Sequence, residues 1–404
     1  MIPLNRRQFV SSALAGAAMA SIPWSVASRT VSAMMQEQPA IDLGKMDLIY
    51  RSKVPRNAEP KLEKLVENWI TPTPQFYIRS HGANPVIVAE EFKVSVEGMV
   101  ERPLVFSIQE LVDKFRKSSC TCTISCAGIR RYEFNKVKEV KGVAWQEGPI
   151  GNAVWSGVRL LDVLKSAGFK AEAKHVWFEG ADEIVDGKAT FPFGGSVPLT
   201  KLLEEEGAML GVLLATHMNG QPLLPDHGFP IRTIVPGYIG ARSVKWLRKI
   251  VVSDKPSPNH FIADVYKMVY AGTPVEIDET APIYRYPVNA ALCSAEQQNG
   301  ETHLTGYALP TGHRNCSISR VEISMDNGTS WTAATLGKEV GDFCWQLWSA
   351  TVTIANPETD ICVRATDSLG NTMPETVPWN PKGYLYNAWH RVPVKSISKL
   401  KTEN

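Results

Sequence analysis

The sequence predicts an α+β protein of two domains, in which a mixed α/β domain is followed by a β-sandwich of immunoglobulin-like size. The chain has 404 residues, too many for one ordinary domain and suitable for two. Segments with helical and strand-like periodicity are mixed as far as about residue 270. Beyond residue 273 only short alternating segments follow, and no long helix is evident over residues 276–404.

The first 33 residues are predicted to be a twin-arginine export signal. Arg6 and Arg7 precede a weakly apolar, alanine-rich run that is followed by small residues. Ser and Gly break the run over residues 9–27, so we expect an export signal and no membrane span once it is removed. The signal predicts a periplasmic protein. Residues 34–60 are polar and contain prolines, which predicts an extended N-terminal arm.

The segments of the first domain, predicted for residues 61–273, can be read in order. PKLEKLVENWI (60–70) has the apolar spacing of a short helix, and FKVSVEGMVERPLVFSIQELVDKF (92–115) predicts two strands and then a helix. WSGVRLLDVLKSAGF (155–169) predicts a helix that ends at Gly168. HVWFEG (175–180) and ATFPFGGSVPL (189–199) are strand-like, PLTKLLEEEGAML (198–210) opens a helix, and residues 229–254 mix strands with Gly and Pro turns.

The second domain, predicted for residues 274–404, consists of short strands. SRVEISMDNGTSWTAATL (319–336) reads as strand, Asp-Asn-Gly turn and strand, which indicates a hairpin. FCWQLWSATVTI (343–354) and DICVRATDSLGN (360–371) predict further strands. A sandwich of two sheets accommodates this pattern.

Three of the seven cysteines, Cys120, Cys122 and Cys126, fall in SSCTCTISCAGIRRYEF (118–134). A structural zinc site needs a fourth ligand, and the closest histidines are His81 and His175. Iron–sulfur spacings also need a fourth cysteine, and the haem attachment pattern C-x-x-C-H is absent from the sequence. A disulfide between Cys120 and Cys122 would be strained. We therefore expect these two to be buried free thiols.

Cys126 has a different setting. Ala-Gly follows it and lets the backbone approach a bulky ligand, while Arg130 and Arg131 lie four and five residues further on. Nearby guanidinium groups favour the thiolate form of a cysteine, which is the form that binds metals, and they attract oxyanions. The net charge of the chain is only +2, which argues against nucleic-acid binding and for a local anion pocket.

Several segments in order carry a resemblance to a known family: ISCAGIRRYEF, VKGVAW, WSGVRLLDVL, LPDHGFPIRTIVPGYIGARSVKWL and YNAWHRV. With them, residues 77–392 resemble the sulfite oxidase family of molybdenum enzymes. The resemblance implies a molybdopterin-binding domain over residues 61–273 and an immunoglobulin-like dimerisation domain over residues 274–404. The expected cofactor is one molybdenum–molybdopterin per chain, with no haem in this chain.

The resemblance also implies which residues form the site. Cys126 would be the thiolate ligand of molybdenum. The residues expected at the substrate are Arg79, Cys126, Arg131, Trp145, Tyr266 and Lys382. Those expected at the cofactor are Tyr77, Ile78, Arg79, Ser80, His81, Cys126, Asp182, His227, Arg232, Ser243, Val244 and Lys245. Lys382 departs from the arginine that the family often has, and it cannot form that arginine's paired hydrogen bonds.

The function implied by the resemblance is periplasmic oxidation of sulfite to sulfate, with electrons passing to an external c-type cytochrome. A homodimer is expected, with a heterodimer containing a haem subunit as the other possibility. Two different functions stay open at this point. One is a periplasmic molybdopterin-dependent sulfoxide reductase of the same superfamily, and the other is a non-catalytic metal-binding or adhesion module built on the sandwich.

Overall fold

The computed structural model describes residues 45–204, 211–269, 281–354 and 358–397, with side chains as far as residue 395. The predicted export signal (1–33), the first part of the predicted arm (34–44) and the predicted boundary between residues 273 and 274 lie outside these ranges. Within them, no helix combines the length and the hydropathy that a membrane crossing requires.

The remainder of the predicted arm is built into the first domain. Strand β1 (Leu48–Ser52) pairs with β2 (Asn57–Pro60), and β2 pairs with β3 (Ile78–Arg79), all antiparallel. All four residues of β2 are buried. From residue 45 the arm therefore supports the segment that contains Arg79.

One five-stranded sheet of the first domain has the order β11-β8-β15-β4-β5, in which only β15 and β4 are parallel. Helix α3 begins with a capping box between Ser107 and Glu110. Helix α5 ends at Gly168, which takes the left-handed conformation that favours glycine. The bounds are β4 (Lys93–Gly98), β5 (Leu104–Ser107), β8 (His175–Gly180), β11 (Gly194–Pro198), β15 (Leu247–Ser253), α3 (Ile108–Lys114) and α5 (Leu160–Ala167).

A second sheet carries the cysteine cluster. Its order is β13-β12-β7-β6, and β14 also pairs with β12. β6 is antiparallel to β7 along its whole length, and Cys126 directly follows it. The bounds are β6 (Lys117–Ser125), β7 (Ile150–Arg159), β12 (Leu213–Met218), β13 (Gln221–Pro222) and β14 (Arg232–Ile234).

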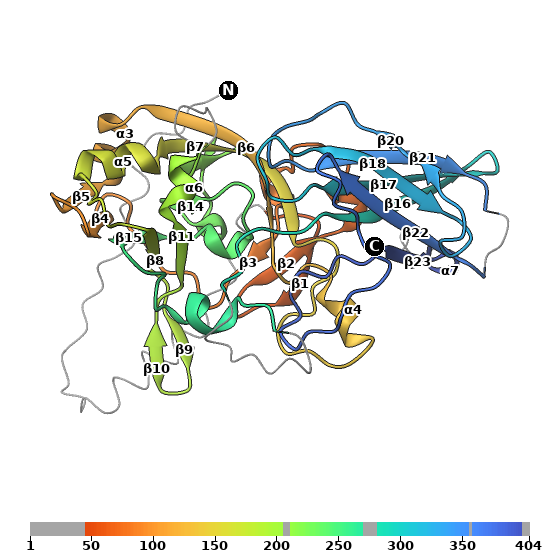
Figure 1. Cartoon of the computed structure of the whole chain (residues 1–404), viewed down its shortest axis with the longest axis horizontal. Coiled ribbons are helices and arrows are strands. Elements are labelled where there is room, and N and C mark those ends of the chain that lie inside the picture. The colour runs from red at the N-terminus through yellow and green to blue at the C-terminus, as the bar shows by residue number, and fades with distance from the viewer. Residues whose placement is uncertain (1–44, 205–210, 270–280, 355–357, 398–404) are drawn as a thin grey trace, which may run out of the picture. The chain divides into compact units, whose positions relative to one another are not determined.

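Short elements complete the first domain. β9 and β10 form a hairpin, visible in Figure 1 as the pair that projects below β8. The bounds are β9 (Ile184–Asp186), β10 (Ala189–Phe191), α2 (Leu62–Leu65), α4 (Arg131–Asn135), α6 (Leu199–Leu203), η1 (Thr73–Gln75), η2 (Pro225–His227), η3 (Gly240–Arg242) and η4 (Phe261–Val265).

The second domain consists of two sheets, with orders β16-β17-β21-β20 and β19-β18-β22-β23. Its core lies between them and contains Leu304, Val321, Trp348 and Val363. Figure 1 shows these strands in blue tones, separate from the sheets of the first domain. The bounds are β16 (Asn289–Gln298), β17 (Glu301–Leu309), β18 (Ile318–Ser324), β19 (Thr332–Ala333), β20 (Thr335–Leu336), β21 (Gln346–Val352), β22 (Asp360–Asp367), β23 (His390–Pro393) and α7 (Val394–Ile397).

The predicted α+β class with a C-terminal sandwich is confirmed, and so is the Asp-Asn-Gly hairpin, in which β18 pairs with β19. Two local predictions need correction. The helix predicted from Trp155 begins at Leu160, because the residues before it form the end of β7. Residues 117–125 form a strand that the sequence analysis did not predict.

Candidate active site

Most of the predicted site residues surround one cavity in the first domain. The space inside the cavity, counted together with the open solvent at its mouth, is about 680 Å³. The predicted residues that line it are Tyr77, Arg79, Ser80, His81, Cys126, Asp182, His227, Arg232, Ser243, Lys245 and Tyr266. They come from segments far apart in the sequence, so the fold brings them together.

Cys126 enters the cavity wall from the end of β6. Its backbone N–H donates to Pro149 O at 2.9 Å, and the Gly128 N–H donates to its Sγ at 3.4 Å. Cys120 and Cys122 are buried upstream in the same strand. All seven cysteines are free thiols, so the isolated role predicted for Cys126 is compatible with the structure.

Cations that are buried or partly buried gather at another part of the cavity wall. Lys245 Nζ donates to Ser80 Oγ at 2.8 Å and to Asp226 O at 2.9 Å. Burial and the neighbouring Arg232 lower the pKa of Lys245 to about 7. Arg232 donates to His227 O at 3.0 Å and to Ser243 O at 2.9 Å, and burial lowers its pKa to about 10. A bound anion would offset this desolvation of positive charge.

Two further residues beside these cations were not predicted from the sequence. Lys45, from the segment before β1, has Nζ 2.5 Å from His227 Nε2 and 2.6 Å from Thr73 O. Burial lowers the pKa of Lys45 to about 7, against the attraction of Asp226. Asp226 lines the cavity and pairs with Arg56 at 3.0 Å. A lone lysine in a polar arm gives no sequence signal, whereas Asp226 stood beside the predicted His227.

Tyr266 and His81 form a hydrogen-bonded pair on the cavity wall, with Tyr266 Oη 2.9 Å from His81 Nε2. Burial raises the pKa of the Tyr266 phenol and lowers the pKa of His81 well below its ordinary value. Both groups are therefore neutral at neutral pH. Phe193 stacks on the His81 ring at a centroid distance of 4.6 Å and limits its movement.

Arg79 and Asp182 are held by the surrounding backbone and polar side chains. Arg79 donates to Asn57 Oδ1 at 3.1 Å, and the same oxygen accepts the Ser80 N–H. Asp182 Oδ1 accepts the Phe193 N–H at 3.1 Å, and burial raises the pKa of this carboxyl. β2 and the start of β11 thus place one cation and one carboxyl on the cavity wall.

Arg131 does not line the cavity. Its guanidinium donates to Gly383 O at 3.0 Å and to Val143 O at 3.2 Å, and it lies over the ring of Tyr384. Tyr384 stacks on Tyr266 at 5.1 Å, so Arg131 stands one aromatic layer behind the cavity. A Cβ on Gly142 would lie 2.7 Å from Arg131 Nη1, which shows how closely the backbone surrounds this cation.

The other predicted residues also lie off the cavity wall. Trp145 is fully buried, and its Nε1–H has no hydrogen-bond partner within the described ranges. Lys382 donates to Asp264 O at 3.1 Å, two residues before Tyr266. Ile78 and Val244 are fully buried neighbours of wall residues. Arg130, the other arginine of the pair, points toward the second domain, where it donates to Ala388 O at 2.7 Å.

The residues present fit a molybdopterin cofactor. A cysteine thiol on a cavity wall suits a soft, sulfur-ligated metal. The cluster of Lys245 with the buried Arg232 and His227 suits a phosphate, because phosphate accepts several charge-assisted hydrogen bonds. Among the described residues that line the cavity, the cations Arg79, Arg232 and Lys245 outnumber the carboxyl groups Asp182 and Asp226.

Comparisons with known proteins agree with this fit. Residues 81–261 match the oxidoreductase molybdopterin binding domain, and residues 279–397 match the Mo-co oxidoreductase dimerisation domain. The chain is 36% identical over 369 residues to sulfite oxidase of Arabidopsis thaliana, with coverage of 84% of this chain and 92% of that protein.

Animal relatives are similar too. Mitochondrial sulfite oxidase of Drosophila melanogaster is 40% identical over 369 residues, which cover 86% of this chain and 63% of that protein. The Gallus gallus sulfite oxidase is 39% identical, with coverage of 84% of this chain and 76% of that protein. The chain spans less than two thirds of the length of the fly relative. Among solved structures, the sulfane dehydrogenase SoxCD of Paracoccus pantotrophus has the same fold, with a TM-score of 0.71, 23% identity and coverage of 95% of this chain and 94% of that one.

The two domains match, in order, the molybdopterin-binding and dimerisation domains of molybdopterin oxidoreductases, and the first of them carries a cysteine thiol on its cavity. More narrowly, the chain belongs to the sulfite oxidase family, since it is more than 30% identical to relatives that it covers over more than two thirds of their length.

Proposed function

We propose that this protein oxidises sulfite to sulfate at a molybdenum–molybdopterin centre bound in the cavity of the first domain. The observation that supports it most is that the free Cys126 thiol and the cations Lys245 and Arg232 line one cavity. When bound, the molybdenum centre would supply the two-electron oxidation and the oxygen transfer. The family relatives that are named sulfite oxidases support sulfite as the substrate.

The residues of this chain would bind and orient the two partners of the reaction. Lys245, Arg232 and His227 would hold the cofactor's phosphate, and the Cys126 thiolate would hold its metal. Arg79 faces the cavity and would attract the sulfite anion, an electrostatic and positioning role.

The residues behind the wall would act through others. Arg131 adds positive charge behind Tyr384, while Lys382 holds the backbone that leads to Tyr266. The neutral Tyr266–His81 pair would supply a hydrogen bond near the reacting atoms and a short path for a proton. Trp145 would pack behind the pocket, where its Nε1–H has no hydrogen-bond partner among the described residues.

The proposed setting is the periplasm, reached through the twin-arginine signal of residues 1–33. The electrons would pass to an external c-type cytochrome, because the sequence contains no C-x-x-C-H pattern for covalent haem. We propose a homodimer, which the match to a dimerisation domain supports.

The test is sulfite-dependent reduction of cytochrome c by the purified protein, with molybdenum measured on the same sample. We expect one molybdenum per chain and reduction that depends on sulfite. Molybdenum-replete protein that reduces no acceptor with sulfite, but reduces a sulfoxide when given electrons, would replace this proposal with a reductase. Fractionation of a cell that expresses the full chain would test export, with a change of both Arg6 and Arg7 to lysine as the control.

A further inference from the structure

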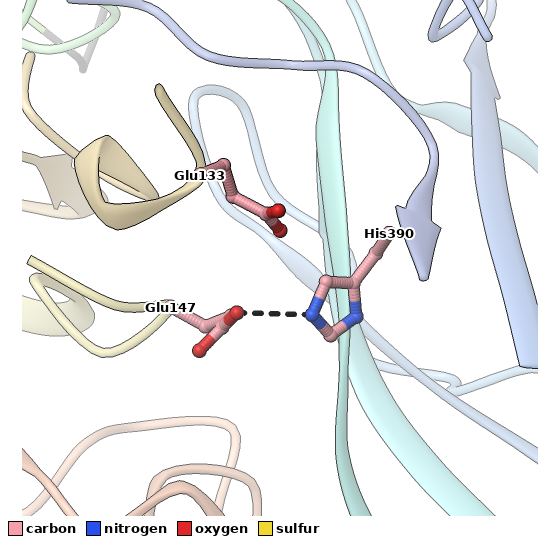
Figure 2. Close-up of side chains that lie close together, drawn as sticks. All are labelled: Glu133, Glu147 and His390. Carbon is pink, nitrogen blue, oxygen red and sulfur yellow. Dashed lines mark hydrogen bonds and ion pairs between the residues drawn. The ribbon is translucent and has the colours of Figure 1, made fainter. Parts of the chain in front are cut away.

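A buried group of polar side chains connects the two domains. Glu133 comes from α4, Glu147 from the segment before β7, and His390 from the first position of β23. Figure 2 shows the Glu147 carboxylate facing the His390 ring, with Glu133 directed toward the same space. His390 Nε2 and Glu147 Oε1 are 3.0 Å apart, and all three side chains are buried.

These side chains offer ligand atoms within 4.8 Å of one another, but their hydrogen bonds favour a different role from metal binding. His390 Nδ1 accepts the Leu292 N–H at 2.9 Å, so the neutral ring carries its proton on Nε2 and donates it to Glu147. Glu147 Oε1 also accepts the Tyr132 hydroxyl at 2.7 Å. Glu133 accepts from Lys136 at 2.9 Å. A metal ion would have to displace these donors.

Glu147 belongs to the segment that supports the loop of Cys126. The N–H groups of Cys126, Arg130 and Tyr132 donate to the carbonyl groups of residues 149, 146 and 145, at 2.9, 2.8 and 3.1 Å. Residues 126–132 and 145–149 thus form a hydrogen-bonded pair of segments. The second domain holds the supporting segment at two points, because the Tyr307 hydroxyl donates to Glu147 O at 2.8 Å and His390 donates to the Glu147 side chain.

The second domain also holds the loop itself. Arg130 donates to Ala388 O at 2.7 Å and to Trp389 O at 3.1 Å, next to His390 in the chain. The Leu385 N–H donates to Ala127 O at 2.8 Å, one residue after the cysteine. Residues 383–390 therefore contact the loop and its support together.

We propose that Glu147 and His390 are positioning residues, which fix the Cys126 loop by joining its supporting segment to the sandwich domain. The sandwich then has a second task beside dimerisation, since it sets where the Cys126 Sγ lies relative to the cavity. The part of this inference that treats Cys126 as a metal ligand rests on the proposed function. The restraint on the loop itself does not depend on any substrate.

The decisive variants are His390→Leu, which removes the donor to Glu147, and His390→Gln, which can keep it and can also accept the Leu292 N–H. The first readout is amide hydrogen exchange of the full protein at Cys126, Arg130 and Tyr132. We expect His390→Leu to speed exchange at these amides by about tenfold or more, with His390→Gln close to the unsubstituted protein. Ser324→Ala is the matched control, because Ser324 is buried in the sandwich and its side chain bonds to Asp326 and Gly328 of its own hairpin.

The second readout is the thiolate-to-molybdenum absorption of the cofactor-loaded protein, which we expect to shift in His390→Leu and to return in His390→Gln. Exchange at the three amides that is unchanged in His390→Leu, or raised equally in Ser324→Ala, would overturn the proposal. If His390→Leu fails to fold, Glu147→Leu serves in its place, since it keeps a similar volume and removes the acceptor of the His390 Nε2–H. A protein without sulfite oxidation but with the expected exchange pattern would overturn the proposed function and leave the positioning role supported.

Discussion

Two buried polar clusters flank the loop that carries Cys126, and their charges are arranged in opposite ways. In the cavity cluster, Lys45, Arg232 and Lys245 lie close together, and burial lowers the pKa of each. In the boundary cluster, Arg130 faces Glu133 and His390 faces Glu147, so charged and polar groups meet partners within the protein.

The difference separates a binding site from a structural connection. Desolvation lowers the pKa values of the cations in the cavity cluster. Holding such charges away from water costs free energy unless an anion binds beside them, so the cavity cluster indicates a ligand. In the boundary cluster each charged or polar group already has a partner within the protein. Truncation of one partner would leave the other without compensation in the protein interior. The predictions below test this contrast, from the largest expected effect to the smallest.

Cys126→Ser should have the largest effect on activity. A hydroxyl is a poor ligand for a soft metal, so we expect a loss greater than the roughly 10–100-fold that removal of an outer partner of a metal ligand costs. Sulfite oxidation and the thiolate-to-molybdenum absorption are the measurements. Cys122→Ser, in strand β6 just before Cys126, is the control and should retain both signals in the folded fraction. Full activity and absorption in Cys126→Ser would exclude Cys126 as the ligand.

Arg130→Met and Arg131→Met should separate the two neighbouring arginines. Arg130→Met leaves Glu133 buried without its arginine and should lower the free energy of unfolding by about 3–5 kcal/mol, measured by urea denaturation. Arg131 bonds to backbone carbonyl groups behind Tyr384, so Arg131→Met should mainly raise KM for sulfite. An equal loss of stability in both variants would contradict the assignment of Arg130 to the boundary cluster and of Arg131 to the cavity side.

Lys245→Met should weaken cofactor retention more than it weakens folding. Loss of a charged hydrogen-bond donor to a phosphate costs about 1.5–3 kcal/mol, equivalent to about 10–150-fold in affinity. The measurement is the molybdopterin content of protein purified at matched yield. Lys249→Met, on the same strand region but half exposed and paired with Glu97, is the control. Equal cofactor content in both variants would remove Lys245 from the phosphate site.

The smallest effect concerns pH. Lys45 and Lys245 have a pKa of about 7 in the folded protein and 10.5 ordinarily, so between these values the unfolded chain binds protons that the folded chain does not. Their contribution to the stability of cofactor-free protein therefore rises as pH increases from about 7. Bound phosphate should raise both pKa values and flatten this rise. Melting temperatures at pH 7–9, with and without inorganic phosphate, give the comparison, and parallel curves would contradict it.

The sequence was sufficient for the fold class and for most of the cavity wall, because the motifs that carry the family resemblance contain wall residues such as His81, His227 and Arg232. It was insufficient for side-chain direction. Arg131 points behind the wall because Gly142 and Gly383, distant in the sequence, leave space for its guanidinium. Lys45 lies 182 residues from His227, and no local pattern could join them.

Strand β6 shows a signal that was present but not used. In CTCTIS the cysteines and the isoleucine alternate with polar residues, a period of two that places them on one face of a strand, and Thr123 and Ser125 on the other face are buried as well. Because the cysteines were considered as metal ligands, this period of two was not used to predict the strand. The burial of Cys120, Cys122 and Ile124 on that face supports the simpler interpretation.

The bonds from Arg130 to Ala388 and Trp389 bear on the order of events during synthesis. The partners are 258 residues apart, so at about 5–20 residues per second the ribosome needs roughly 10–50 s to add the second after the first. Throughout that interval the loop of Cys126 lacks its final restraints. Maturation of the metal site should therefore follow completion of the sandwich, and a nascent chain halted before residue 382 should fail to retain molybdopterin.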